Sequence, residues 1–356
     1  MIDRLARALT APRDPSGLAI FRVLFGLIGA ISAVRFLAYG WVGDMFVKPR
    51  FHFKHMGFEW VRVLPETGMY ALFAALAAVS LMVAAGLFYR AAIVLFFLGF
   101  SYVQLLCVTN YLNHYYLVML LAGLMALLPM NAAWSLDARL FPRVRRASVP
   151  AWAVYALRFQ VAIVYTFAGL AKVNADWLLH GQPLGVWLSA RTGTPLVGPL
   201  FALPGAAIVM SWAGCLFDLT IALWLSVRRT RLAAYGVVLV FHAHVGAVPH
   251  RDVPAHHGDG GAGVLPAFVA ARSRRPRSSP VPRAGAGAEE VAEPGSAREP
   301  APEPVPAFVA GRAWWHVPAF VAFSGYALFQ VLFPLRAHLY GGDVHWHERG
   351  CAGRGA

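Results

Sequence analysis

Eight long apolar runs follow one another along this chain of 356 residues and limit the folds open to it. A helix needs about 20 mostly apolar residues to cross the hydrocarbon core of a bilayer. The runs lie at residues 17–38, 69–88, 91–108, 115–130, 152–171, 205–226, 232–247 and 314–335. They predict an all-α fold, a polytopic transmembrane helix bundle with about eight spans.

Composition supports a membrane protein and argues against other classes. Of all residues, 58% are hydrophobic and 13% are charged, against about 25% charged residues in soluble domains. The net charge of +14 would suggest a nucleic-acid partner in a soluble protein. Here the basic residues form short clusters between apolar runs, so we expect the lipid bilayer as partner and no nucleic acid. The three cysteines form no CxxC pair, which argues against a disulfide framework or a zinc ribbon.

The basic clusters predict the orientation in the membrane. They comprise Arg4, Arg7 and Arg13, then Arg90, then Arg139, Arg143, Arg145 and Arg146, and finally Arg228, Arg229 and Arg231. With alternating spans, all of them fall on one side, and basic loop residues concentrate in the cytoplasm. We therefore expect a multi-pass protein of the cell membrane with a cytoplasmic N-terminus and with the loops 40–67 and 173–204 outside.

The outer loops are rich in aromatic residues. Both the 40–67 loop and the segment 177–188 (WLLHGQPLGVWL) carry several Trp and Phe or Leu side chains. Trp and Tyr prefer the membrane–water interface, so we expect these segments to lie there. Two interpretations stay open: a lid over a membrane-embedded site, or a structural cap on the bundle.

Ionisable residues inside spans are costly and need partners. Arg22 is expected to pair or to line the bundle interior, and Arg35 can extend its side chain to the outer interface. Asp218 lies in the middle of its span and needs a partner or a proton. The histidines at 242 and 244 lack a recurring carboxylate–histidine spacing, so no metal site is expected.

Asn113 and His114 stand at the outer start of the fourth span. In one interpretation Asn113 caps the helix and His114 hydrogen-bonds a neighbour. In the other, His114 faces a pocket near the outer leaflet.

Lys172 ends the fifth span and is the only lysine in the predicted spans. Arg158, Tyr165 and Lys172 are seven residues apart and share one helix face. Lys172 is either a snorkelling residue paired with Asp176 or a partly buried amine that acts as a base. Arginine cannot act as a base because it stays protonated, so the choice of lysine favours chemistry.

The sequence resembles the vitamin K-dependent γ-carboxylase family, in its bacterial branch of horizontally transferred transmembrane (HTTM) domain proteins. The matching stretches are FRVLFGLIGAISAVRFLAYGWV, FHFKHMGFEWV, NYLNHYYLVMLLA, RFQVAIVYTFAGLAKVNADWLLHGQPLGVWL, LFDLTIALWL, FH at 241–242 and QVLFPLRAHLYGGDVHWHERG. They cover residues from about 15 to 242 and from 314 to 350. The block AGLAKVNADW is the most specific of them.

The resemblance implies a chemistry and its residues. The family's animal members oxygenate reduced vitamin K, a lipidic quinol, with O2, and couple this to carboxylation of peptide glutamate with CO2, a lyase-type reaction without a metal. Lys172 matches the lysine that deprotonates the quinol, and His114 matches the histidine that assists it. Both are expected on the outer side, facing one pocket. Asn113, Tyr165 and Trp177 are the expected contacts of the quinol.

Two alternatives to an enzyme stay open: a transporter or channel, and a membrane scaffold without chemistry. Transporters tend to contain internal repeats, and no repeat is visible here. The animal carboxylases have a large C-terminal extramembrane region, whereas this chain stops soon after its last predicted span. Quinol oxygenation is therefore expected ahead of protein carboxylation.

Residues 243–310 differ in composition from the rest. They lack Ile, Met, Thr, Lys, Asn, Gln, Trp, Tyr and Cys, and as an outer linker they would place several arginines on the wrong side. We interpret the stretch as a disordered linker or as the product of a frame shift. The expected organisation is an HTTM transmembrane domain at 1–247, this segment at 248–312, and a last span with a short tail at 313–356.

Overall fold

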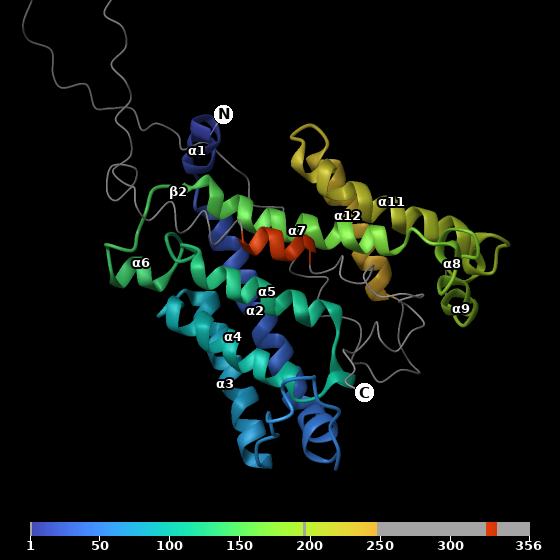
Figure 1. The fold of residues 1–356 in the computed structure, drawn as a ribbon, viewed down its shortest axis with the longest axis horizontal. Coiled ribbons are helices and arrows are strands. Elements are labelled where there is room, and N and C mark those ends of the chain that lie inside the picture. The colour runs from blue at the N-terminus through green and yellow to red at the C-terminus, as the bar shows by residue number, and fades with distance from the viewer. Residues whose placement is uncertain (1, 195–196, 248–324, 333–356) are drawn as a thin grey trace, which may run out of the picture.

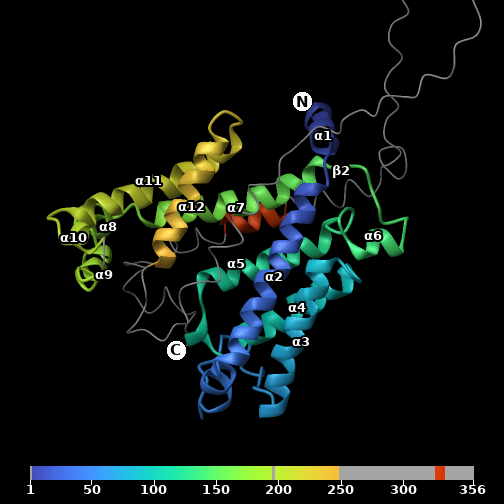
Figure 2. The same ribbon diagram turned by 180° about the vertical axis from the view of Figure 1, so that it is seen from behind.

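The computed structural model describes residues 2–194, 197–247 and 325–332. The described part is almost entirely helical (Figures 1 and 2). Two sequence predictions lie mostly outside it: the linker or frame-shifted segment, and the eighth span, of which residues 325–332 are described as helix.

Seven predicted runs are helices. They are α2 Ser16–Ala38, α3 Glu66–Ala85, α4 Tyr89–Leu105, α5 Asn113–Leu127, α7 Ala151–Ala171, α11 Ala206–Ser226 and α12 Arg231–Ala247. Four of them, α2, α3, α7 and α11, are long and apolar enough to cross a membrane. The other three, α4, α5 and α12, are apolar over shorter stretches of 10 to 17 residues. The all-α membrane fold is thus confirmed, whereas the number of eight spans stays a prediction.

Short elements connect these helices. They are α1 Ile2–Thr10, β1 Pro12–Arg13, the π-helical turn η1 Gly43–Val47, the 3-10 turn η2 Val108–Asn110, α6 Leu136–Leu140, β2 Val149–Pro150, α8 Ala175–Leu178, α9 Leu184–Ser189 and α10 Gly198–Phe201. Strand β1 pairs with β2 in antiparallel register. In Figure 1, α1, β2 and α6 lie at one end of the bundle, and α8 and α9 lie at the opposite end.

Helices α2 and α3 form the most extensive helix pair. A Cβ atom added at Gly26 would lie 2.4 Å from the backbone nitrogen of Ala84 and 2.6 Å from the carbonyl oxygen of Ser80. A Cβ atom added at Gly29 would lie 2.9 Å from the hydroxyl oxygen of the Ser80 side chain. Small residues let membrane helices approach until their backbones touch. The pair therefore depends on glycine at position 26.

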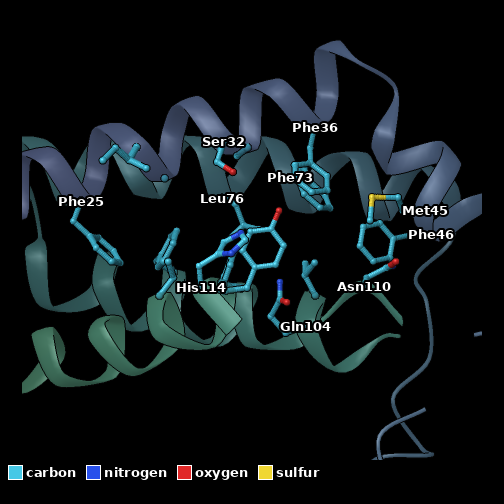
Figure 3. A pocket seen from close by; sticks show the side chains of 18 residues that line it. Phe25, Ser32, Phe36, Met45, Phe46, Phe73, Leu76, Gln104, Asn110 and His114 are labelled. Carbon is cyan, nitrogen blue, oxygen red and sulfur yellow. The ribbon is translucent and has the colours of Figure 1, made fainter. Parts of the chain in front are cut away.

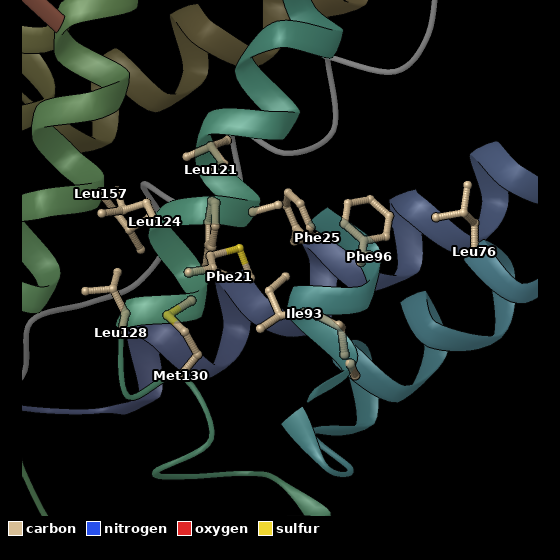
Figure 4. Close-up of a cluster of buried hydrophobic side chains, with 14 of the residues drawn as sticks. Phe21, Phe25, Leu76, Ile93, Phe96, Leu121, Leu124, Leu128, Met130 and Leu157 are labelled. Carbon is tan, nitrogen blue, oxygen red and sulfur yellow. The ribbon is translucent and has the colours of Figure 1, made fainter. Parts of the chain in front are cut away.

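The core lies where α2, α4, α5 and α7 meet (Figure 4). Its labelled side chains include Phe21, Phe25, Ile93, Phe96, Leu121, Leu124, Leu128 and Leu157. Phe25 and Phe96 meet edge to face with ring centroids 5.5 Å apart, an arrangement that aromatic rings prefer. This packing holds α5 against α2 and α4.

Arg22 lines the bundle interior, as one of its two predicted roles requires. It is fully buried and donates hydrogen bonds to the carbonyl oxygens of Val83 (3.2 Å) and Trp134 (2.6 Å). Val83 belongs to the last turn of α3, whose carbonyls lack partners within the helix. Nearby, Asp137 accepts a hydrogen bond from the backbone N–H of Tyr89 at 3.0 Å. These polar contacts connect α2, α3, α4 and the α6 region at one end of the bundle.

Residues 40–65, which we call the outer cap because the sequence predicts that they lie outside, are fastened to the end of α4. Lys54 donates hydrogen bonds to the carbonyl oxygens of Val61 (2.7 Å) and Leu106 (3.1 Å). The backbone N–H of Val108 donates to the carbonyl oxygen of Phe53 at 2.7 Å. The cap also exposes large aromatic side chains, among them Trp60 at 74%. These contacts hold the cap against the end of α4, and both interpretations, a lid or a structural cap, stay predictions.

Cysteine labelling tests the predicted orientation. Ser189 ends α9, and Ser148 lies between α6 and β2. In a variant whose native cysteines are replaced, Ser189→Cys should react with an impermeant maleimide in intact cells, and Ser148→Cys should react only after lysis. The reverse pattern would invert the topology.

Candidate functional site

Lys172 forms a partly buried ion pair with Asp218. Helix α7 ends at Ala171, and the Lys172 ammonium that follows lies 2.6 Å from Oδ2 of Asp218 in α11. It also donates a hydrogen bond to the carbonyl oxygen of Ala168 at 3.1 Å. Asp218 is only 5% exposed. The predicted pairing of Lys172 with Asp176 is therefore wrong: the mid-span carboxylate of the neighbouring helix takes that place.

Close packing of α7 on α11 brings the two charges together. A Cβ atom at Gly169 would lie 2.9 Å from the backbone nitrogen of Leu219, so glycine is required where the helices cross. The Cys215 sulfur lies 3.8 Å from the carbonyl oxygen of Gly169. Leu219 adjoins Asp218, and Gly169 precedes Lys172 by three residues. The crossing therefore fixes the distance between amine and carboxylate.

Two of the predicted site residues border this pair. The Trp177 ring centroid lies 5.2 Å from the Lys172 nitrogen, within the range of a cation–π contact. Its indole N–H donates to the carbonyl oxygen of Ser211 at 2.8 Å, which fixes the ring. Tyr165 is 6% exposed and packs edge to face on Phe217. Among the described residues its hydroxyl has no hydrogen-bond partner.

The pair has the chemistry of a proton acceptor. The Lys172 nitrogen and the Asp218 carboxylate oxygen lie 2.6 Å apart, so the carboxylate can balance the charge of an ammonium at this position. Titratable groups in such contact share protons as a unit. An amine can act as a base once it has lost its proton, a role that arginine cannot take.

His114 lies elsewhere, in a cavity between α2, α3, α4 and α5 (Figure 3). Aromatic and aliphatic side chains form most of the lining, and the polar members are Ser32, Gln104, Asn110, His114 and Tyr115. The free volume of about 60 Å³ is less than the roughly 150 Å³ that holds a benzene ring. A quinol ring would enter only if the lining moved apart.

The lining of this cavity does not include Lys172, so the pocket shared by His114 and Lys172 stays a prediction. Asn113 is the first residue of α5, and the N-cap position belongs to Leu112, so its predicted role as helix cap is wrong. His114 packs edge to face on Tyr115 with centroids 4.7 Å apart. Within the residues that the structure describes, no group of three or more His, Cys, Asp or Glu side chains is placed to hold a metal ion.

Comparison with known proteins identifies the family. No solved structure gives a significant match to this chain. The family model for the HTTM domain matches residues 10–248, which include α2 to α12 and both Lys172 and His114. The matched region covers more than half of the sequence and includes every helix described above except α1 and the segment 325–332. The chain therefore belongs to the HTTM domain family of membrane proteins.

Proposed function

We propose that this HTTM domain protein is a membrane enzyme that oxygenates a lipidic hydroquinone, reduced vitamin K or another quinol. The observation that carries the proposal is the partly buried pair of Lys172 and Asp218, with the nitrogen and oxygen 2.6 Å apart. An ion pair withdrawn from water is a poor means of stabilising a protein, because desolvation offsets much of the attraction. A catalytic role gives the pair a reason to exist.

In this proposal Lys172 removes the proton from a quinol hydroxyl, and Asp218 balances the charge of the ammonium that forms. The resulting phenolate is electron-rich and reacts with O2. One oxygen atom enters the ring as an epoxide, and the other leaves as water with the two hydrogens of the quinol. Lys172 is thus the catalytic base, and Asp218 acts through it as a positioning residue.

The surroundings of the pair suit a lipid-soluble substrate. Leu170 and Val173 flank Lys172 in the sequence and are 50% and 54% exposed. Trp177 offers an aromatic face beside the amine, and among the described residues the buried Tyr165 hydroxyl is free to donate a hydrogen bond. A quinol dissolved in the bilayer would reach this place without crossing water.

His114 is proposed to assist from the cavity between α2 and α5, and Asn113 to contact the quinol beside it. Carboxylation of a peptide glutamate, with CO2 as co-substrate, is the further activity that the likeness to γ-carboxylases suggests. It would require the same base to act first, because oxygenation supplies the driving force. Quinol oxygenation is therefore the activity to measure first.

The test is a single reaction started with oxygen. The purified protein is reconstituted in nanodiscs, incubated anaerobically with vitamin K hydroquinone and then exposed to O2, and the products are separated by chromatography. We expect oxygen-dependent formation of the epoxide. Asp218→Asn should lose the activity, and the matched control Asp176→Asn, at an exposed carboxylate, should keep it. Absence of epoxide with the correctly folded wild type would refute the proposal.

A further inference from the structure

A second cavity lies within the outer cap and the first turn of α3. It has a volume of about 660 Å³ and is lined only by residues between 46 and 66. Of these, only Phe46 also lines the His114 cavity. We call this second cavity the basic basin because of the side chains described next.

The basin carries a surplus of positive charge. Arg50, Lys54 and Arg62 line it, against the single carboxylate of Glu66. Both arginines are exposed, and neither has an ion-pair partner among the described residues. Lys54 uses two of its three N–H groups on backbone carbonyls, which leaves one for a ligand. Arginine and lysine grouped in this way are typical of sites for phosphate or carboxylate.

The backbone adds to this preference for an anion. Pro65 and Glu66, at the start of the 20-residue helix α3, line the basin, and no side chain caps this end of the helix. The free N–H groups of a helix N-terminus favour negative charge. In addition, Nε2 of His52 is buried and has no hydrogen-bond partner within the described part of the chain. The basin thus gathers donors from both side chains and backbone.

Arg50, Lys54 and Arg62 lie in a loop that the sequence predicts to be outside, where basic residues are uncommon, so a bound anion would explain them. Basic residues are depleted from outer loops, yet the predicted outer cap holds three of them around one basin. Phe51, Phe53 and Trp60, in the same cap, are 70%, 57% and 74% exposed. Exposed aromatic side chains of this kind lie at the level of lipid headgroups. At the level of the headgroups, the most abundant anionic group next to the basin is therefore the phosphate of a lipid.

We propose that the basic basin binds the phosphate of a phospholipid headgroup in the outer leaflet. Arg50 and Arg62 hold the phosphate, Lys54 contributes its remaining N–H, and the aromatic side chains of the cap lie among the neighbouring acyl chains. The bound lipid would fasten the outer cap to the membrane surface. This proposal is independent of quinol chemistry.

Lipid titration tests the proposal. The purified full chain in an uncharged detergent is titrated with short-chain phosphatidylglycerol, and bound lipid is counted by native mass spectrometry. The double variant R50Q/R62Q should bind about tenfold more weakly, because two charge-assisted hydrogen bonds are lost. The matched control R143Q/R145Q removes two exposed arginines from the opposite side and should bind like the wild type.

Two further arms separate the sources of the ligand. Diacylglycerol of the same chain length, which lacks the phosphate, should not bind at this site, and millimolar inorganic phosphate should displace the lipid only weakly. Equal binding by R50Q/R62Q and wild type, tight binding of diacylglycerol, or full displacement by inorganic phosphate would each overturn the proposal. Both arginines are exposed, so we expect the double variant to fold like the wild type. An unchanged unfolding midpoint verifies this.

Discussion

Replacing Lys172 with arginine should abolish quinol oxygenation and leave the protein folded. Arginine keeps the positive charge opposite Asp218, so the ion pair between α7 and α11 is retained in kind. It cannot give up its proton, so it cannot take one from a quinol. Because a general base contributes about 100-fold to 10,000-fold to a rate, we expect a loss of at least about 100-fold. Epoxide formation and the unfolding midpoint in detergent are measured side by side.

Further variants separate catalysis from structure. Lys172→Ala should be inactive as well, and added small amines should restore part of its activity, since they replace the missing base. His114→Ala should reduce the rate less than either Lys172 variant. Full epoxide formation by a folded Lys172→Arg protein would show that the residue is an interface anchor. Loss of activity on His114 replacement alone would move the reaction to the cavity between α2 and α5.

Replacing Gly26 with valine should destabilise the bundle more than any other single glycine change in α2. The added Cβ would meet backbone atoms of Ala84 and Ser80 at 2.4 and 2.6 Å. Backbone atoms cannot rotate away as a side chain would, so α2 and α3 must separate. We expect a loss of about 3 kcal/mol or more, at the upper end for overpacked cores. Thermal unfolding in detergent, followed by circular dichroism, measures it.

The control for this prediction is Gly214→Ala in α11. A Cβ added there meets nothing within 4 Å, and alanine favours a helix over glycine by about 0.5–1 kcal/mol. Its unfolding midpoint should stay the same or rise. A Gly26→Val protein that unfolds at the wild-type temperature would mean that α2 and α3 do not pack at backbone distance.

The sequence allowed the helices to be predicted because their signal is local. Apolar runs such as 152–171 and 205–226 coincide with α7 and α11 to within one residue at each end. The bilayer forces backbone groups to bond within each segment, so a long apolar run has few alternatives to a helix. Arg22 was also predictable in kind: a buried cation has to find oxygen atoms, and it does so at the end of α3.

The pairing of Lys172 with Asp218 could not be deduced from either residue alone. Both stood out as costly groups in predicted spans, but which helices touch is decided by packing between segments far apart in the sequence. The deciding contact is Gly169 on Leu219, and nothing local to either helix specifies it. The sequence did offer one hint, which is that opposite charges in neighbouring spans can pair. Lys172, the only lysine in the predicted spans, and Asp218, a lone mid-span carboxylate, lie in consecutive long helices.

The cavity of His114 shows a different limit. Its lining combines side chains from 25 to 118, and its volume of about 60 Å³ depends on how tightly these side chains pack. Sequence patterns place a histidine at the outer end of a helix, but they do not determine the free space in front of it. The predicted contact between His114 and a quinol therefore depends on motion of this lining.

The most direct test of the central claim is the fate of oxygen. The wild-type protein in nanodiscs is supplied with a reduced quinol and ¹⁸O2, and the quinone products are examined by mass spectrometry. If Lys172 and Asp218 serve a quinol oxygenase, the epoxide carries one ¹⁸O atom, and the Lys172→Arg protein forms none. Oxidation of the quinol to the quinone without incorporation of ¹⁸O, equal in wild type and variant, would contradict the proposed function.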